Sequence, residues 1–288
     1  MILLTLRDLR HRAVRFAVVT VLGAVVFTLL FVMTGLVEQF NLEPYDTVDA
    51  FGASTWVTAE GISGPFTASA PIPLSSFLRV DADRSAPAVV ARSSVTLGAE
   101  AEEIVLVGHV PESLGAPPTI EGRTAEAPGE VVVDDTLDVS VGEPILVGGE
   151  PFTVVGRSTD TSLLAGIPLA VVVLEDAQDR VFRTRDVISV VLADGEVGVV
   201  PDGTVAVPAD DIALSALGPL DGAIASVDLV RVLLWLVAAV IIGAVVYLSA
   251  LERQRDFAVL KAVGTSNSSL LGSLALQAVL IALGAVAL

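Results

Sequence analysis

Residues 16–37 read FAVVTVLGAVVFTLLFVMTGLV, and these 22 residues contain no charged side chain. At about 1.5 Å per residue, a helix of this length is roughly 33 Å long, enough to cross a hydrocarbon core of about 30 Å. Arg15 precedes the stretch and Glu38 follows it. The stretch therefore predicts a first transmembrane helix over 16–37, and with it a membrane protein.

A cleavable signal peptide is the alternative interpretation, because the four arginines within residues 1–15 resemble a positively charged n-region. The apolar core of a signal peptide is usually about 7–15 residues long and is followed by a small-x-small cleavage site. The stretch here is longer, and no convincing site of that kind precedes Glu38. We therefore favour an uncleaved anchor.

Two further apolar runs lie near the C-terminal end of the sequence. Residues 232–251 carry no charge, and residues 270–288 are again apolar. Buried helices of a soluble core are the alternative, but neither run has a polar face. We expect transmembrane helices over 230–251 and 270–288. Because the sequence stops inside the last run without an interfacial flank, we expect that helix to be truncated and a fourth to follow Leu288.

The charged residues are distributed unevenly along the chain. Hydrophobic residues make up 53% of the 288, too many for an ordinary soluble domain. Residues 38–229 hold 31 acidic and eight basic side chains, a net charge of −23, whereas four basic residues lie in 1–15 and three in 252–269. The positive-inside rule places the N-terminus and the 252–269 loop in the cytoplasm. The acidic segment 38–229 is then extracytoplasmic.

Residues 1–15 alternate apolar and basic side chains, which predicts an amphipathic helix lying along the cytoplasmic interface. A merely charged start of the first transmembrane helix is the alternative.

The extracytoplasmic segment contains short valine-rich stretches separated by Gly, Pro and Asp, a pattern typical of β-strands and tight turns. A helix is predicted over 175–182, and another over 215–231 leads into the second transmembrane helix. Without cysteine, the domain must be stabilised by its own apolar core. The pattern predicts a β-rich α+β domain inserted in an α-helical membrane protein, with strands at 56–58, 104–109, 130–134, 144–148, 151–156, 169–174 and 187–192.

No catalytic or metal site stands out among these residues. The two histidines are His11 and His109, and there is no cysteine, so a zinc site or a nucleophilic cysteine is unsupported. We interpret His109 as a structural residue of an apolar strand. The neighbouring carboxylates at 134–138 and 210–211 lack the ligand spacing of a calcium loop.

A nucleotide-binding loop of the Walker type needs a lysine followed by Ser or Thr. Lys261 is the only lysine of the sequence, and it is followed by Ala262. Any ATP energy that the protein uses must therefore come from a partner ATPase.

Residues 251–266 read LERQRDFAVLKAVGTS. A charged first turn is followed by apolar residues, with Phe257 and Leu260 at i, i+3 on one helix face and Gly264 placed to end the helix. A solvated hairpin between two spans is the alternative. Apolar side chains in a short cytoplasmic loop are unfavourable, however, unless they bury against lipid or another protein.

This loop resembles the one between the second and third spans of the FtsX-like permeases, also described as the MacB or LolC type, which are membrane subunits of type VII ABC transporters. The family pattern is E-R-x-x-E-[IF]-x-[VI]-L-[RK]-A-[LV]-G-[AT]-[ST]. Here Asp256 stands where the family mostly has Glu, and Ala258 replaces a frequent Gly. Residues 129–156 also resemble part of the family's periplasmic core domain, and the topology agrees over the whole chain.

The resemblance implies a non-catalytic permease subunit without a cofactor or metal of its own. It implies a homodimer in the bacterial plasma membrane, bound to two copies of an ATPase that hold ATP and Mg²⁺. The subunit would transmit ATP-driven motion to its external domain and so serve export, extraction or regulation of an envelope process. The ATPase-coupling residues would be Glu252, Arg253, Asp256, Phe257, Leu260, Lys261 and Gly264.

Membrane lipid and an envelope or periplasmic protein are the other partners implied, and nucleic acid is not among them. A membrane-anchored extracytoplasmic sensor or scaffold without an ATPase is the alternative function. A membrane enzyme is disfavoured because the sequence shows no set of nucleophile and base.

Overall fold

The computed structural model describes residues 13–98, 100–164, 166–252 and 254–262, together with residues 264, 272, 275, 276, 278, 279, 282 and 283. The chain divides into two compact units: one holds the chain up to Glu38 and from Gly222 onward, and the other holds Gln39–Asp221. Most of the predicted helices at 1–15 and 270–288 lies outside the described residues.

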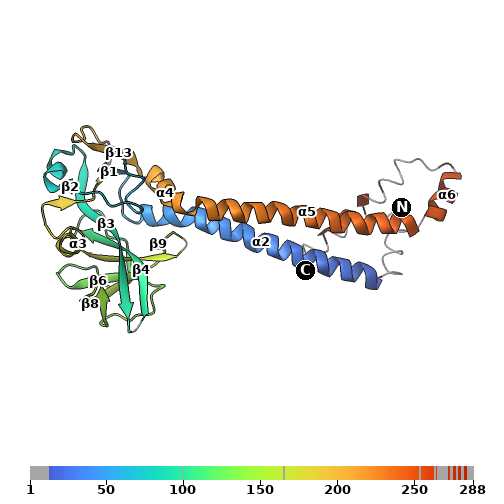
Figure 1. Ribbon diagram of the computed structural model, residues 1–288, viewed down its shortest axis with the longest axis horizontal. Coiled ribbons are helices and arrows are strands. Elements are labelled where there is room, and N and C mark those ends of the chain that lie inside the picture. Colours follow the sequence, from blue (N-terminus) through green and yellow to red (C-terminus); the bar gives the residue numbers. More distant parts are fainter. Residues whose placement is uncertain are drawn as a thin grey trace. The chain divides into compact units, whose positions relative to one another are not determined.

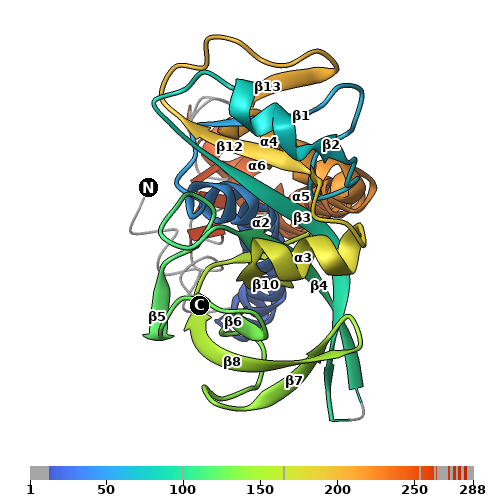
Figure 2. The same ribbon diagram turned by 90° about the vertical axis from the view of Figure 1, so that its left-hand side faces the viewer.

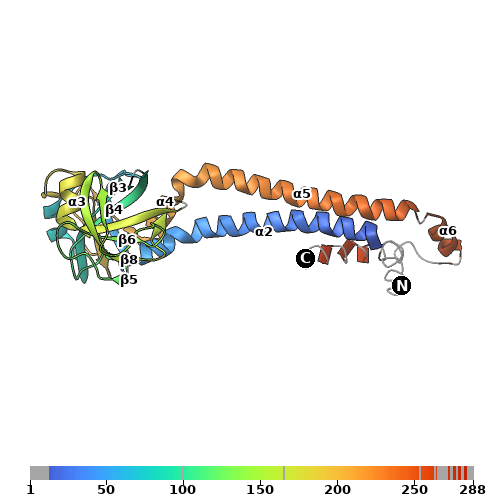
Figure 3. The same cartoon turned by 90° about the horizontal axis from the view of Figure 1, so that it is seen from below.

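Two long apolar helices build the first unit. Helix α2 (Ala13–Asp49) has 37 residues and α5 (Asp221–Glu252) has 32. Each includes a stretch that is long and apolar enough to cross a membrane. Within this unit the two helices run side by side, as Figures 1 and 3 show. The predicted transmembrane helices at 16–37 and 230–251 are thus both helical, and they flank the extracytoplasmic domain in sequence.

The two helices of the first unit meet through a narrow seam. The rings of Phe27 and Trp235 pack edge to face, with centroids 6.0 Å apart and planes at 83°. Val26, Phe27 and Ala238 are buried there, whereas Val240 is 61% exposed. In lipid, helix association depends on such close packing, because apolar side chains gain nothing from leaving a hydrocarbon solvent. The exposed apolar side chains suit contact with lipid or with further helices.

Both helices differ from the predicted spans at their extracytoplasmic ends. Helix α2 continues past the apolar run to Asp49 and includes Pro44, whose ring nitrogen has no hydrogen to donate to the preceding turn. The predicted helix over 215–231 is interrupted, because Pro219 lies in a 3₁₀ turn, η2 (Gly218–Leu220), that separates α4 (Ala209–Leu217) from α5. Hydropathy located an apolar part of each helix but not the full helix.

The second unit is built on a large mixed sheet. Within the described residues this sheet has 11 strands, in the order β13-β1-β12-β3-β4-β10-β6-β8-β5, with β7 paired to β3 and β8 and β9 paired to β10. Figure 2 shows the sheet with α3 lying across it. Two short strands, β2 and β11, form a separate pair.

The remaining elements have the following bounds: β1 (Thr55–Ala59), β2 (Ile72–Pro73), the 3₁₀ helix η1 (Leu74–Arg79), β3 (Arg84–Leu97), β4 (Glu100–His109), β5 (Thr119–Gly122), β6 (Glu130–Asp134), β7 (Pro144–Val147), β8 (Glu150–Ser158), β9 (Ser162–Leu163), β10 (Ile167–Val173), α3 (Leu174–Val181), β11 (Val187–Ile188), β12 (Val190–Asp194), β13 (Thr204–Pro208) and α6 (Gln254–Ala262).

Strand β3 joins the two halves of the sheet, although the sequence did not predict it. Its first residues pair with β12 and the rest pair with β4. The strand contains Pro87, which cannot donate to a sheet ladder, and it is rich in alanine and serine, which are poor strand formers. The predicted strand over 187–192 is also divided, because the Ser189 hydroxyl accepts a bond from the Val90 N–H at 2.7 Å.

The sheet separates two hydrophobic cores. Along β4, Val105 and Val107 face one core, while Ile104 and Leu106 face the other. This alternation follows from the two-residue period of a strand. Because both faces are covered, the strands form nearly continuous apolar runs, and this explains why the valine-rich stretches predicted strands so well.

The first core, hereafter the main core, also holds the ends of the helices that connect the domain to the spans. Val48 and Phe51, at and just beyond the end of α2, are each 1% exposed, and Ile212 and Ala216 of α4 are buried in the same cluster. The ring of Phe51 lies 5.0 Å from that of Trp56, centroid to centroid. Both chain connections of the domain are therefore anchored in one core.

A buried carboxylate closes the sheet at the end of β6. Asp134 is 1% exposed. Its Oδ1 accepts bonds from the N–H and hydroxyl of Thr136 at 3.0 and 2.6 Å, and its Oδ2 accepts bonds from the N–H and hydroxyl of Thr161 at 3.0 and 2.6 Å. Four donors compensate for the lost hydration of the carboxylate, as a buried charge requires.

His109 ends β4 inside the core and is fully buried. Its Nδ1 lies 3.1 Å from the carbonyl oxygen of Val110, and its Nε2 has no partner among the described residues. Burial lowers the pKa of this imidazole, because removal from water disfavours its charged form. The geometry agrees with a structural role.

We expect Asp134→Ala to lower the stability of the domain by about 3 kcal/mol, because four donors lose a charged acceptor. Thermal unfolding of the full chain in detergent, followed by circular dichroism, measures this loss. Asp135→Ala is the matched control, since Asp135 is exposed and should change stability by less than about 0.5 kcal/mol. Equal melting temperatures for the two variants would contradict the role assigned to Asp134.

The lowered pKa of His109 predicts a pH dependence of stability. The unfolded chain binds a proton as the pH falls below about 6.5, while the folded chain resists protonation. Stability contributed by the neutral imidazole is therefore complete above that pH and declines below it. The melting temperature should fall between about pH 7 and pH 5 more steeply in the wild-type chain than in His109→Gln. Parallel pH profiles of the two would show that His109 is not the group responsible.

Candidate functional site

The loop after α5 forms the short helix α6. Gly264 follows this helix with φ +97°, and its N–H donates to the carbonyl of Lys261 at 3.0 Å. Glycine takes this left-handed conformation without the penalty of a Cβ atom and is a frequent helix terminator. The helix and its ending agree with the prediction from the sequence of the loop.

The predicted coupling residues lie in one continuous segment. Glu252 is the last residue of α5, Arg253 lies outside the described residues, and Gly264 follows the helix. Phe257 and Leu260 are three positions apart in α6 and therefore share a face of the helix. The residues of the set that lie within α6 are Asp256, Phe257, Leu260 and Lys261.

The surface of α6 includes exposed apolar side chains. Val259 is 65% exposed, and Ala258 and Ala262 are exposed as well. Lys261 lies in the last turn, where its charge interacts favourably with the helix dipole. A short helix of this kind is suited to insertion into a groove of another protein.

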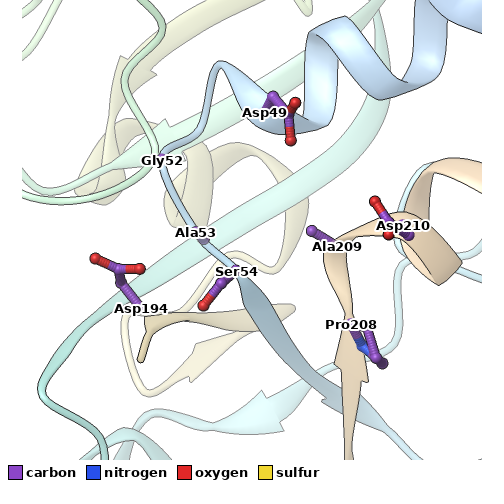
Figure 4. A pocket seen from close by; sticks show the side chains of 8 residues that line it. All are labelled: Asp49, Gly52, Ala53, Ser54, Asp194, Pro208, Ala209 and Asp210. Carbon is purple, nitrogen blue, oxygen red and sulfur yellow. The ribbon is translucent and has the colours of Figure 1, made fainter. Parts of the chain in front are cut away.

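The extracytoplasmic domain has a polar pocket of about 410 Å³ beside the end of α2. Figure 4 shows Asp194 near Ser54, with Asp210 on the other side of the pocket and Asp49 at the end of the helix. Arg84 pairs with Asp194 at 3.5 Å. Within the part of the chain that the structure describes, no three His, Cys, Asp or Glu side chains are placed to hold a metal ion.

A second pocket, of about 700 Å³, is mainly apolar. It lies around η1, where Leu78 is 81% exposed, and Asp186 gives it one charged group. Pockets of this volume and character are typical of ligand or partner binding. The lining residues are Pro73, Leu74, Ser75, Phe77, Leu78, Pro87, Leu174 and Asp186.

Neither pocket was predicted from the sequence. The polar pocket combines residues 49–54 with Asp194 and with 208–210, and the apolar pocket combines η1 with Pro87, Leu174 and Asp186. Because these segments are far apart along the chain, no local sequence pattern indicates that they line the same pocket.

Known proteins resemble this chain over nearly its whole length. A family model, FtsX-like permease C-terminal, matches residues 229–288. The uncharacterized ABC transporter permease Rv2563 of Mycobacterium tuberculosis is 36% identical over 292 residues, and the uncharacterized ABC transporter permease Rv0072 of the same species is 34% identical over 287 residues. Each alignment covers 98% of this chain and 82% of the relative.

Among solved structures, the periplasmic region of MacB from Actinobacillus actinomycetemcomitans matches with a TM-score of 0.40 and 11% identity, over 59% of this chain and 96% of that one.

Identity at this level over nearly the full length places the chain among membrane subunits that have no catalytic activity themselves and work with an ATPase partner. It is a membrane protein with an extracytoplasmic domain, and it belongs to the FtsX-like permeases of ABC transporters.

Proposed function

We propose that this permease transmits ATP-driven motion of its partner ATPase to the extracytoplasmic domain. The observation that carries the proposal is the continuity of the helices. Helix α2 runs without a break from Ala13 to Asp49, and Val48 at its end is buried in the main core of the domain. A helix is stiff along its axis because successive turns are hydrogen-bonded to one another, and in α2 Pro44 leaves one of these bonds unmade. Displacement of the span therefore reaches the domain.

The partner ATPase acts on the permease through α6. Helix α5 ends at Glu252 and α6 starts at Gln254, only two positions later. A partner that binds α6 therefore acts directly on the second span. Phe257 and Leu260 insert into a groove of the ATPase, and the charged members of the coupling set, with Gly264, fix the orientation of the helix.

The energy is supplied in trans. With Ala262 after the only lysine, the chain cannot form a Walker loop. Two ATPase subunits hold ATP and Mg²⁺ and act on a permease homodimer in the bacterial plasma membrane. The N-terminus and α6 face the cytoplasm.

Motion of the spans results in a movement of the acidic extracytoplasmic domain. The first span ends in the main core through Val48, and the second is preceded by α4, whose Ile212 and Ala216 are buried in the same core. A relative shift of the two spans thus acts on one packed cluster, and such clusters respond by repacking rather than by gradual deformation. The moving domain then acts on an envelope protein or lipid-anchored cargo, and no substrate needs to pass through the chain.

We expect Phe257→Asp or Leu260→Asp to reduce co-purification of the permease with its ATPase at least tenfold. A carboxylate cannot enter an apolar groove without losing its hydration. The measurement is the ATPase-to-permease ratio after affinity purification from membranes.

The matched control for this experiment is Ala262→Asp, which adds the same charge on the opposite side of α6. Protease protection of the extracytoplasmic domain checks that all three variants insert correctly. Unchanged co-purification of Phe257→Asp and Leu260→Asp would remove the coupling role from α6.

A further inference from the structure

The extracytoplasmic end of α2 is hydrogen-bonded to a turn more than 110 residues away in the sequence. The Glu43 carboxylate oxygen Oε1 accepts a bond from the Ser162 hydroxyl at 2.6 Å and another from the Gly166 N–H at 2.9 Å. One turn later, the Thr47 hydroxyl donates to the carbonyl of Ser162 at 2.5 Å. These three bonds, two to Ser162 of β9 and one to Gly166 in the turn that follows, are hereafter the α2 clamp.

The clamp holds a backbone that is unfavourable by itself. Leu164 has φ +56°, in the left-handed region that leucine rarely adopts, and Gly166 has φ +103°. Such conformations persist only where the surroundings enforce them. Two restraints are present here, because the Leu164 side chain is 8% exposed within the main core and Glu43 binds the Gly166 N–H.

The clamp continues into the sheet through polar contacts. Thr161, next to Ser162, donates to Asp134 of β6 through both its N–H and its hydroxyl. Its carbonyl accepts a bond from the Leu169 N–H of β10 at 3.0 Å. A chain of hydrogen bonds therefore connects α2 with two neighbouring strands of the sheet.

The covalent chain does not lead from α2 directly to β10 and β6. Helix α2 leads into β1, and α4 follows β13; both strands lie at one end of the sheet order. Strands β10 and β6 lie beyond β3 and β4 in that order. The bonds of Glu43 and Thr47 are thus a polar route from the first span to the far half of the sheet that the covalent path does not provide.

We propose that the α2 clamp passes displacement of the first span to the β9, β10 and β6 part of the domain, with Glu43 and Thr47 as positioning residues. This proposal rests on the proposed function. A charged acceptor suits the role, since its bonds are stronger than those of a neutral group while they remain at the surface of the domain and can be broken without opening the core.

Hydrogen–deuterium exchange of the full chain in lipid nanodiscs tests the clamp itself. In Glu43→Ala the Gly166 N–H loses its acceptor, and exchange in residues 162–168 should rise at least tenfold. Thr47→Val, which keeps the size of the side chain, and Glu43→Gln, which keeps an oxygen but loses the charge, should give smaller increases. Glu38→Ala is the matched control, because Glu38 lies exposed on the same helix and should leave exchange unchanged.

The second arm adds the ATPase and compares exchange with and without ATP. The wild-type chain and Glu38→Ala should show an ATP-dependent change in β10 and β6, whereas Glu43→Ala should lose that change and still retain the ATPase. A wild-type response in Glu43→Ala would overturn the proposal. Faster exchange of Glu43→Ala throughout the domain would overturn it too, because the contact would then only stabilise the fold.

The experiment also distinguishes failure of the α2 clamp from failure of the proposed function. A wild-type chain whose domain shows no ATP response while its ATPase is bound would overturn transmission as a whole, and the clamp with it. Phe257→Asp separates the two steps, because it should lose the ATPase and leave exchange of residues 162–168 at the wild-type value. Loss of the ATPase in Glu43→Ala would count against the clamp and leave the coupling role of α6 intact.

Discussion

The structure depends on the burial of two helix ends in one hydrophobic core. In lipid, every backbone polar group must be bonded within the segment, so a span has to be a continuous helix. Here α2 does not end where the apolar run ends; it continues until Val48 reaches the main core of the domain. The second span is preceded by α4, whose Ile212 lies in that same core. The core therefore buries both the end of α2 and the helix that precedes the second span.

The sheet gives this core a rigid support. Strand β3 pairs with β12 by its first residues and with β4 by the rest, so it joins the strands next to the helix ends to the strands beyond them. Buried apolar runs cover both faces. Asp134, with four hydrogen bonds, fastens the end of β6 to the segment before β9.

The proposed coupling helix and the pockets of the extracytoplasmic domain lie in different parts of the chain. The sequence has no Walker loop, and α6 is the segment with exposed apolar side chains next to the second span. The extracytoplasmic domain has two pockets, one beside the end of α2 and one around η1. This arrangement fits a permease subunit of an ABC transporter, which works with a separate ATPase.

The sequence by itself determined the features that repeat along neighbouring residues. Uncharged runs located the two long apolar helices, valine-rich stretches located strands such as β6, and a glycine after a short apolar segment, Gly264, marked the turn that follows α6. Only the tertiary structure decided that β3 is a strand despite Pro87, that α2 continues to Asp49, and that Glu43 binds Ser162 and Gly166. The physical reason is that these features depend on partners from distant segments: a strand needs its neighbours, and a helix end needs a core to bury it.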